Sequence, residues 1–214
     1  MSVRIEYQAL SDLVGYVDAF PEAARTAARI ALNDVTEDQG LKQFREAIEA
    51  QVDFGPGYIN IDRLGITSRA KNEQLRVVVT GRHRATSLAR FAKGQSPVSN
   101  VGVQNSARQR GVRVKVKAGG ATKTIRSGFL VKLNRGSAGI RDGFNVGLAV
   151  RLKPGERLLN KTKHVQLDNN VVLLYGPSVD QVFRDVAVDE TPALLPKIES
   201  EYFRQFFRLT KNAK

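Results

Sequence analysis

The chain is 214 residues long, 42% of its residues are hydrophobic, and its formal net charge is +13 at pH 7. This composition supports a single folded domain over residues 1–214, and the absence of cysteine excludes disulfides, thiolate nucleophiles and sulfur-ligated metals. No apolar run approaches the roughly 20 residues that span a bilayer, and residues 1–10 lack a signal-peptide core, so we expect a protein made in the cytoplasm without a membrane partner.

The positive charge is concentrated in the middle of the chain. No acidic residue lies between Glu73 and Asp142, whereas the same window holds 15 of the 34 basic residues. The other 19 basic residues face all 21 acidic residues, so the middle carries the whole excess. Such segregated charge is favourable only near an acidic partner, either phosphate or a carboxylate-rich protein surface. The sequence therefore predicts a near-neutral scaffold that presents a basic insert.

Two helices are predicted in the first quarter of the chain. Apolar residues at helical spacing predict a short helix over residues 10–19. A second stripe of apolar residues predicts a helix of about 30 residues from about 20 to 52, because the stripe keeps the helical period over that length. Pro21 is tolerated in its first turn, and Gly40 is a candidate kink.

A β-hairpin and a long irregular segment follow. Residues 64–69 and 75–80 have the composition of two strands joined by a turn. Residues 82–110 are then rich in small and polar side chains, which predicts an extended basic arm or insert within the domain. A loop of that length is commonly functional or ordered by a partner.

The predicted sheet begins at a strand with strict alternation. Residues 112–117 place three valines on one face and three cations on the other, and residues 122–125 can pair back on them. Further strands are predicted over residues 129–133, 144–150 and 171–174. Together they predict a mainly antiparallel sheet of five to six strands.

The chain is predicted to end in two helices. The first begins near Val179, and the second follows Thr191-Pro192. Phe203 and Phe207 add a second apolar edge to the last helix, which favours burial by another subunit. The predicted fold is therefore α+β, with the long N-terminal helix packed on a mainly antiparallel sheet, C-terminal helices and an extended basic arm.

No residue set has the spacing of a catalytic or metal-binding motif. We therefore predict no enzymatic activity, no cofactor and no metal. The residues considered for such roles, and interpreted as ordinary surface side chains, are His83, His164, Asp62 with Glu73, and Asp180 with Asp185.

The candidate contacts to phosphate or to an acidic partner are basic residues of the middle segment. They are Arg82, Arg84, Arg90, Arg108, Arg110, Arg113, Lys115, Lys117, Lys123 and Arg126. If the partner is nucleic acid, the contacts would be independent of sequence, because the chain has no helix-turn-helix, zinc-finger or aromatic stacking motif. The alternative is that the alternating strand simply presents a solvated sheet face.

The segment Tyr175-Gly176-Pro177-Ser178 precedes the first C-terminal helix. We interpret it as a structural turn, because glycine permits the turn and proline starts the helix.

Five segments together resemble the minor tail protein Z family of tailed bacteriophages, and the resemblance covers most of residues 20–183. These segments are Ala31-Leu32-Asn33, Thr80-Gly81-Arg82 leading to Leu88-Ala89-Arg90-Phe91, residues 112–117, Gly128-Phe129-Leu130, and Leu174 to Val179 with its Tyr-Gly-Pro-Ser element. The family consists of tail-completion proteins.

The resemblance implies a structural virion protein that completes the head-proximal end of the tail, so that the tail can join a DNA-filled head. Related neck and terminator proteins work as rings, so we expect a homo-oligomeric ring, for example a hexamer. The implied partners are the tail tube or tail terminator, neck or connector proteins, and the genomic DNA end. In a ring, a modest charge on each subunit becomes a strong collar around a channel.

A second hypothesis uses the same basic middle. In this hypothesis the chain is a cytoplasmic protein that binds nucleic acid without sequence specificity. DNA binding that weakens steeply with salt would favour it.

Overall fold

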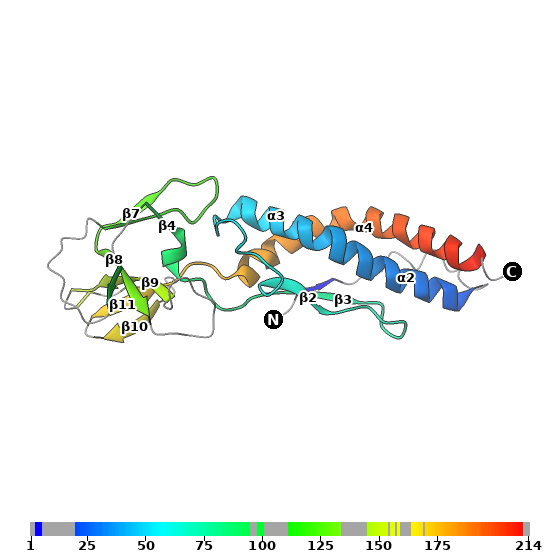
Figure 1. Ribbon diagram of the computed structural model, residues 1–214, viewed down its shortest axis with the longest axis horizontal. Coiled ribbons are helices and arrows are strands. Elements are labelled where there is room, and N and C mark those ends of the chain that lie inside the picture. The colour runs from blue at the N-terminus through cyan, green and yellow to red at the C-terminus, as the bar shows by residue number, and fades with distance from the viewer. Residues whose placement is uncertain are drawn as a thin grey trace. The chain divides into compact units, whose positions relative to one another are not determined.

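The computed structural model describes residues 3–5, 20–94, 98–100, 111–133, 145–153, 155–156, 158, 164–168 and 170–211 (Figure 1). The chain separates into two compact units: unit 1 comprises Met1–Ile48, Ile59–His83 and Val179–Lys214, and unit 2 comprises Glu49–Tyr58 and Arg84–Ser178. Helices and mainly antiparallel sheets confirm the predicted α+β class. The single domain stays a prediction, and the predicted helix over residues 10–19 lies outside the described residues.

The long N-terminal helix is confirmed. Helix α2 (Pro21–Val35), the π-helical segment η2 (Thr36–Gly40) and helix α3 (Leu41–Gln51) follow one another without a break. Pro21 occupies the first turn, where its missing N–H removes no helical hydrogen bond. Figure 1 shows α2 beside helix α4 (Val179–Lys211), with the two running in opposite directions. Small side chains allow the close approach, and the buried alanines of α2 are Ala24, Ala27, Ala28 and Ala31.

The prediction of two separate C-terminal helices is wrong, because α4 continues through both predicted segments as a single helix of 33 residues. Pro192 and Pro196 lie inside it, where proline usually costs about 3 kcal/mol. Packing offsets this local cost: Leu194, between the two prolines, is fully buried. It lies against Gly40, whose added Cβ would be 3.3 Å from its Cδ1 atom. The two prolines predict a helix break, and the sequence gives no indication that Leu194 between them is buried.

Unit 1 contains a three-stranded antiparallel sheet of order β1-β3-β2. Strands β2 (Leu64–Ser68) and β3 (Val77–Gly81) form the predicted hairpin. Strand β1 (Val3–Ile5) pairs with the other edge of β3 and was not predicted.

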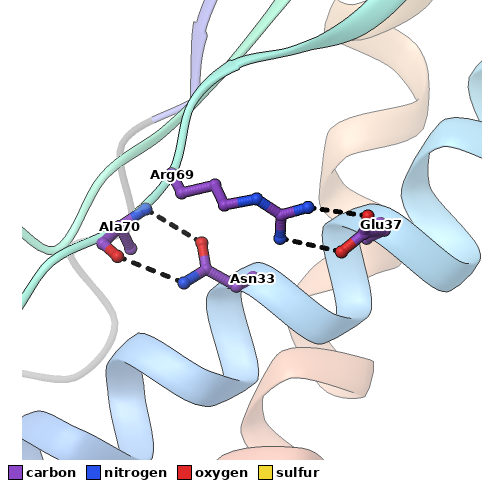
Figure 2. Close-up of polar contacts among 4 residues, drawn as sticks. All are labelled: Asn33, Glu37, Arg69 and Ala70. Carbon is purple, nitrogen blue, oxygen red and sulfur yellow. Dashed lines mark hydrogen bonds and ion pairs between the residues drawn. The ribbon is translucent and has the colours of Figure 1, made fainter. Parts of the chain in front are cut away.

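Two side chains of the long helix hold the end of the hairpin strand β2 (Figure 2). The Asn33 side chain forms two hydrogen bonds with the Ala70 backbone: its Oδ1 accepts from the amide at 2.9 Å and its Nδ2 donates to the carbonyl at 3.1 Å. One turn further on, Glu37 accepts two hydrogen bonds from the Arg69 guanidinium, at 2.8 and 2.7 Å. These contacts fix the hairpin against the helix and give Asn33 of the Ala-Leu-Asn segment a structural role.

The five-stranded sheet of unit 2 has the order β10-β11-β9-β8-β5. Its strands are β5 (Val98–Asn100), β8 (Gly128–Leu133), β9 (Asn145–Arg151), β10 (His164–Asp168) and β11 (Val171–Leu174). Among these described strands, the β5–β8 pair is parallel and the other pairs are antiparallel. The buried side chains of Val131, Ala149 and Leu173 form its core cluster.

The second sheet of unit 2 has the order β4-β6-β7, with strands β4 (Ala92–Lys93), β6 (Val112–Val114) and β7 (Lys123–Ile125). The sequence predicted one sheet of five or six strands with the long helix on it, whereas the strands divide among three sheets and the helix lies in the unit with the β1-β3-β2 sheet. The alternation of apolar and polar residues identifies a strand. The strand with which it pairs depends on segments that are distant in sequence.

The described part of the predicted arm is ordered within the two units. Residues 82–83 belong to unit 1, and residues 84–94 continue into unit 2 as the 3₁₀-helix η3 (Leu88–Phe91) and strand β4. Phe91 is fully buried against Phe54. Residues 95–97 and 101–110 lie outside the described residues, so an extended arm over residues 82–110 stays a prediction.

Candidate anion-binding surface

The whole net charge of the chain belongs to unit 2. The residues of this unit include 18 basic and five acidic side chains, a net charge of +13. Unit 1 has 16 of each and is neutral. The charge segregation seen along the sequence is therefore also a segregation between the two units.

Strand β6 is the centre of the β4-β6-β7 sheet and carries the alternation predicted for it. Val112 and Val114 are buried, and Arg113 between them is exposed. Register places Arg113 directly opposite Lys93 of β4 and Thr124 of β7, so these three residues share one face. Two like charges directly opposite each other destabilise a sheet unless an anion lies nearby.

One carboxylate partly compensates this pair. Asp53 binds the Lys93 ammonium at 2.8 Å, and the Asp53 amide donates to the Val116 carbonyl, which ties residue 53 to the strand after β6. An antiparallel bridge between Val52 and Lys117 continues the same pairing. Among the residues that the structure describes, Arg113 has no acidic partner, so the positive charge of this face is in excess.

An arginine beside this sheet is held by an aromatic ring. The Arg90 guanidinium carbon lies 4.2 Å from the centroid of the Tyr58 ring, a cation–π contact that restrains the side chain. Tyr58 is itself stacked on Phe54, and Phe54 contacts Phe91. The exposed guanidinium of Arg90 therefore packs against a buried aromatic cluster.

The Tyr-Gly-Pro-Ser segment contacts the beginning of the predicted arm. Tyr175 forms an antiparallel bridge with Ser87, and the Gly176 amide donates to the Thr86 carbonyl at 2.8 Å. Gly176 lies against the ring of Phe91. The segment is thus an extended connection between β11 and α4, so the predicted turn is wrong: Gly176 has no positive φ, and α4 begins at Val179 rather than at Pro177. Its contacts with Thr86 and Phe91 still give it a structural role.

The candidate residues are distributed as follows. Arg82 lies in unit 1, and the other described candidates lie in unit 2. Those that are exposed are Arg84, Arg90, Arg113, Lys117, Lys123 and Arg126, while Arg82 and Lys115 are half-buried. Arg108 and Arg110 lie outside the described residues. The structure brings Arg113, Lys115 and Lys117 onto one segment and Lys123 onto the neighbouring strand.

Lys93 was missed as a candidate, although it lies opposite Arg113. The sequence carries no signal for this neighbour, because 20 residues separate the two and register alone places them together. It could be found only by predicting the pairing of a two-residue strand.

The interpretation of Asp180 as a surface charge is wrong. Its side chain is 2% exposed, and its Oδ2 atom lies 3.0 Å from His83 Nδ1 and 2.7 Å from the Arg184 guanidinium. The Asp180 amide also donates to the Arg82 carbonyl at 3.2 Å. This cluster attaches the first turn of α4 to the end of β3, so it holds unit 1 together. The spacing of Asp180 and Arg184, four residues apart at a helix start, was the available signal.

Within the described part of the chain, no group of three or more histidine, cysteine, aspartate or glutamate side chains could hold a metal ion. The helices that the structure describes include none with the length and apolarity needed to cross a membrane. Comparison of the chain with protein-family models, curated proteins and solved structures gave no match.

Proposed function

We propose that the chain is a structural virion protein that completes the head-proximal end of a phage tail and supports the joining of head and tail. The observation that carries the proposal is the division into a neutral helical unit and a second unit with the whole net charge of +13. The resemblance to the minor tail protein Z family adds to it, because its Asn33, Phe91 and Gly176 have defined structural contacts in this chain.

The two units suit two kinds of contact. Among the described residues, six large hydrophobic side chains are exposed, and five of these lie in unit 1: Phe20, Ile61, Val188, Leu195 and Phe207. Exposed apolar side chains are typical of protein contacts, so unit 1 would bind neighbouring copies in a ring and the tail tube, terminator or connector proteins. Unit 2 would present its cations to the incoming DNA end or to an acidic neighbour. Repetition around a ring would multiply that field.

The proposal is tested by removing the protein from a phage that encodes it. We expect DNA-filled heads and finished tails to accumulate without joining, and resupply of the protein to restore joined particles. Imaging of labelled protein should place it at the head-proximal end of the tail. Joined, DNA-filled particles assembled without the protein would refute the proposal.

The charge of unit 2 also favours a second candidate function, a cytoplasmic protein that binds nucleic acid without sequence specificity and outside any particle. The discriminating measurement is the amount of the protein in purified virions. A fixed number of copies per particle supports the structural role, whereas absence from particles together with recovery on host nucleic acid supports the alternative.

A further inference from the structure

We propose that the β4-β6-β7 sheet of unit 2 is a binding surface for the phosphates of duplex DNA, which it contacts without reading the base sequence. The inference rests on the proposed function, in which the partner of the charged surface is either DNA or an acidic protein. It names DNA as that partner.

The charges of this sheet suit an anion. Lys93 and Arg113 are directly opposite in the β4–β6 register, and Asp53 neutralises only Lys93. A cross-strand pair of like charges costs stability in the free protein. Binding of an external phosphate would relieve that repulsion.

The spacing of the cations also suits phosphates. Arg113 of β6 and the following Lys115 and Lys117 alternate with Val114 and Val116. Residues two apart in an extended strand are roughly 6.6 Å from each other. This repeat is comparable with the separation of successive phosphates along one nucleic-acid strand. Lys123 of β7 lies opposite Val114, so it belongs to the other face of the sheet and is not part of the surface that Arg113 and Lys93 share.

The side chains around these cations favour nucleic acid over an acidic protein. The centre of a protein interface is enriched in aromatic and other large apolar residues. Among the described residues, no exposed large hydrophobic side chain belongs to β4, β6 or β7, and the one such residue in unit 2 is Val165 of β10. Charge without an apolar centre is typical of phosphate-backbone contacts.

The aromatic residues of unit 2 favour a duplex over a single strand. Single-strand binding depends on aromatic side chains that stack on bases. Among the described Phe and Tyr residues of unit 2, Phe54, Tyr58 and Phe91 are buried and Phe129 and Tyr175 are half-buried, so none of them is exposed as a stacking platform would be. Arg90 covers the ring of Tyr58. The surface therefore favours paired strands, whose phosphates are exposed and whose bases are not.

The test uses the full chain and a fluorescent duplex of mixed sequence, with binding followed by anisotropy over a range of salt concentrations. The test variant is the triple substitution Arg113→Gln, Lys115→Gln and Lys117→Gln, because these three cations alternate along one segment, where Arg113 and Lys117 are exposed and Lys115 is half-buried. Each lost phosphate contact should make the slope of log K against log salt less negative by about one, so we expect a change of about three. At about 0.1 M salt the triple variant should bind roughly a hundredfold more weakly.

The matched control removes the same charge from unit 1: Lys42→Gln, Lys71→Gln and Arg208→Gln, all exposed in the wild-type chain. It should keep the wild-type slope to within about one contact. Circular dichroism melting confirms that both triple variants are folded. An equal loss of binding in the two variants would overturn the proposal, because the net charge and not the sheet would then decide binding.

Two further probes decide the class of partner. A single strand of the same length should bind more weakly than the duplex, and tighter binding of the single strand would overturn the proposal. Polyglutamate should compete poorly, and competition equal to that of duplex DNA at the same charge would assign the surface to an acidic protein. If the protein does not bind DNA but heads and tails still need it to join, this inference alone is refuted. If the protein binds DNA but heads and tails join without it, the proposed function alone is refuted.

Discussion

A Cβ atom added to Gly176 would lie 2.7 Å from the Cε2 atom of Phe91, whose ring is fully buried. Real Cβ contacts are longer than this, and a buried ring has no open space into which it can move. The glycine of the Tyr-Gly-Pro-Ser segment is therefore required by packing against the end of η3. This contact joins two of the segments that carry the family resemblance.

The first prediction follows from that contact. Gly176→Ala should lower the free energy of unfolding by about 1–3 kcal/mol, because the added methyl group overpacks the Phe91 site. Urea unfolding measured by circular dichroism tests it. Gly119→Ala is the matched control, since a Cβ there meets nothing within 4 Å, and it should leave stability within about 0.5 kcal/mol. Equal stability of the two variants would refute the packing argument.

The second prediction concerns the Asn33 contact. Asn33→Ala removes two hydrogen bonds and leaves the amide and carbonyl of Ala70, which is buried, without these partners. We expect a loss of about 2–3 kcal/mol in the free energy of unfolding. Asp34→Ala, at the exposed neighbouring position of α2, should change stability by less than about 0.5 kcal/mol. Similar values for the two variants in urea unfolding would show that Asn33 does not hold the hairpin.

The third prediction concerns the buried carboxylate. Asp180→Asn should destabilise unit 1, because an amide group replaces the charge that accepts from His83 and Arg184. These partners are 50% and 42% exposed, so solvent limits the loss to about 1–3 kcal/mol. Thermal unfolding tests it, with Asp185→Asn, at an exposed position of the same helix, as the control. The interpretation fails if the control loses as much stability as Asp180→Asn.

The fourth prediction is a pH dependence. Hydrogen bonds from Arg69 hold the pKa of Glu37 below its ordinary value. A lowered folded-state pKa means that the pair stabilises the fold at pH values above the ordinary carboxyl pKa, and that this contribution is lost as the pH falls through the lowered value. Both side chains are about half exposed, so the contribution at pH 7 is only about 0.5 kcal/mol.

A double-mutant cycle with Glu37→Gln and Arg69→Gln measures this contribution. The coupling energy should stabilise the fold at pH 7 and be absent at about pH 2, where the carboxyl group is protonated. A coupling that persists unchanged at the low pH would show that charge is not its source.

The fifth prediction links the proposed surface to stability. Arg113→Thr removes the charge opposite Lys93 and should raise the free energy of unfolding by about 0.5 kcal/mol at low salt. The gain should shrink at high salt, because screening weakens the repulsion in the wild-type chain. Unfolding at two salt concentrations tests it, and Lys71→Thr in neutral unit 1 should show no such salt-dependent gain. A variant that is less stable at low salt would show that the pair is not repulsive.

Much of the fold could be predicted from local patterns. The long helix, the hairpin and the β6 alternation were all predicted, because each depends on the spacing of apolar residues within one segment. The single C-terminal helix was not, because the burial of Leu194 against Gly40 outweighs the local signal of two prolines. The short strands β1, β4 and β5 were missed because two or three residues carry no readable period.

The amino-acid sequence by itself determined that positive charge is concentrated in one part of the chain, because the charge of a segment depends only on which residues it contains. Only the tertiary structure decided that this charge belongs to a body separate from a neutral helical one, that Lys93 faces Arg113, and that Asp180 is buried. These are properties of strand register and packing. They depend on contacts between residues far apart in sequence, which no local spacing reports.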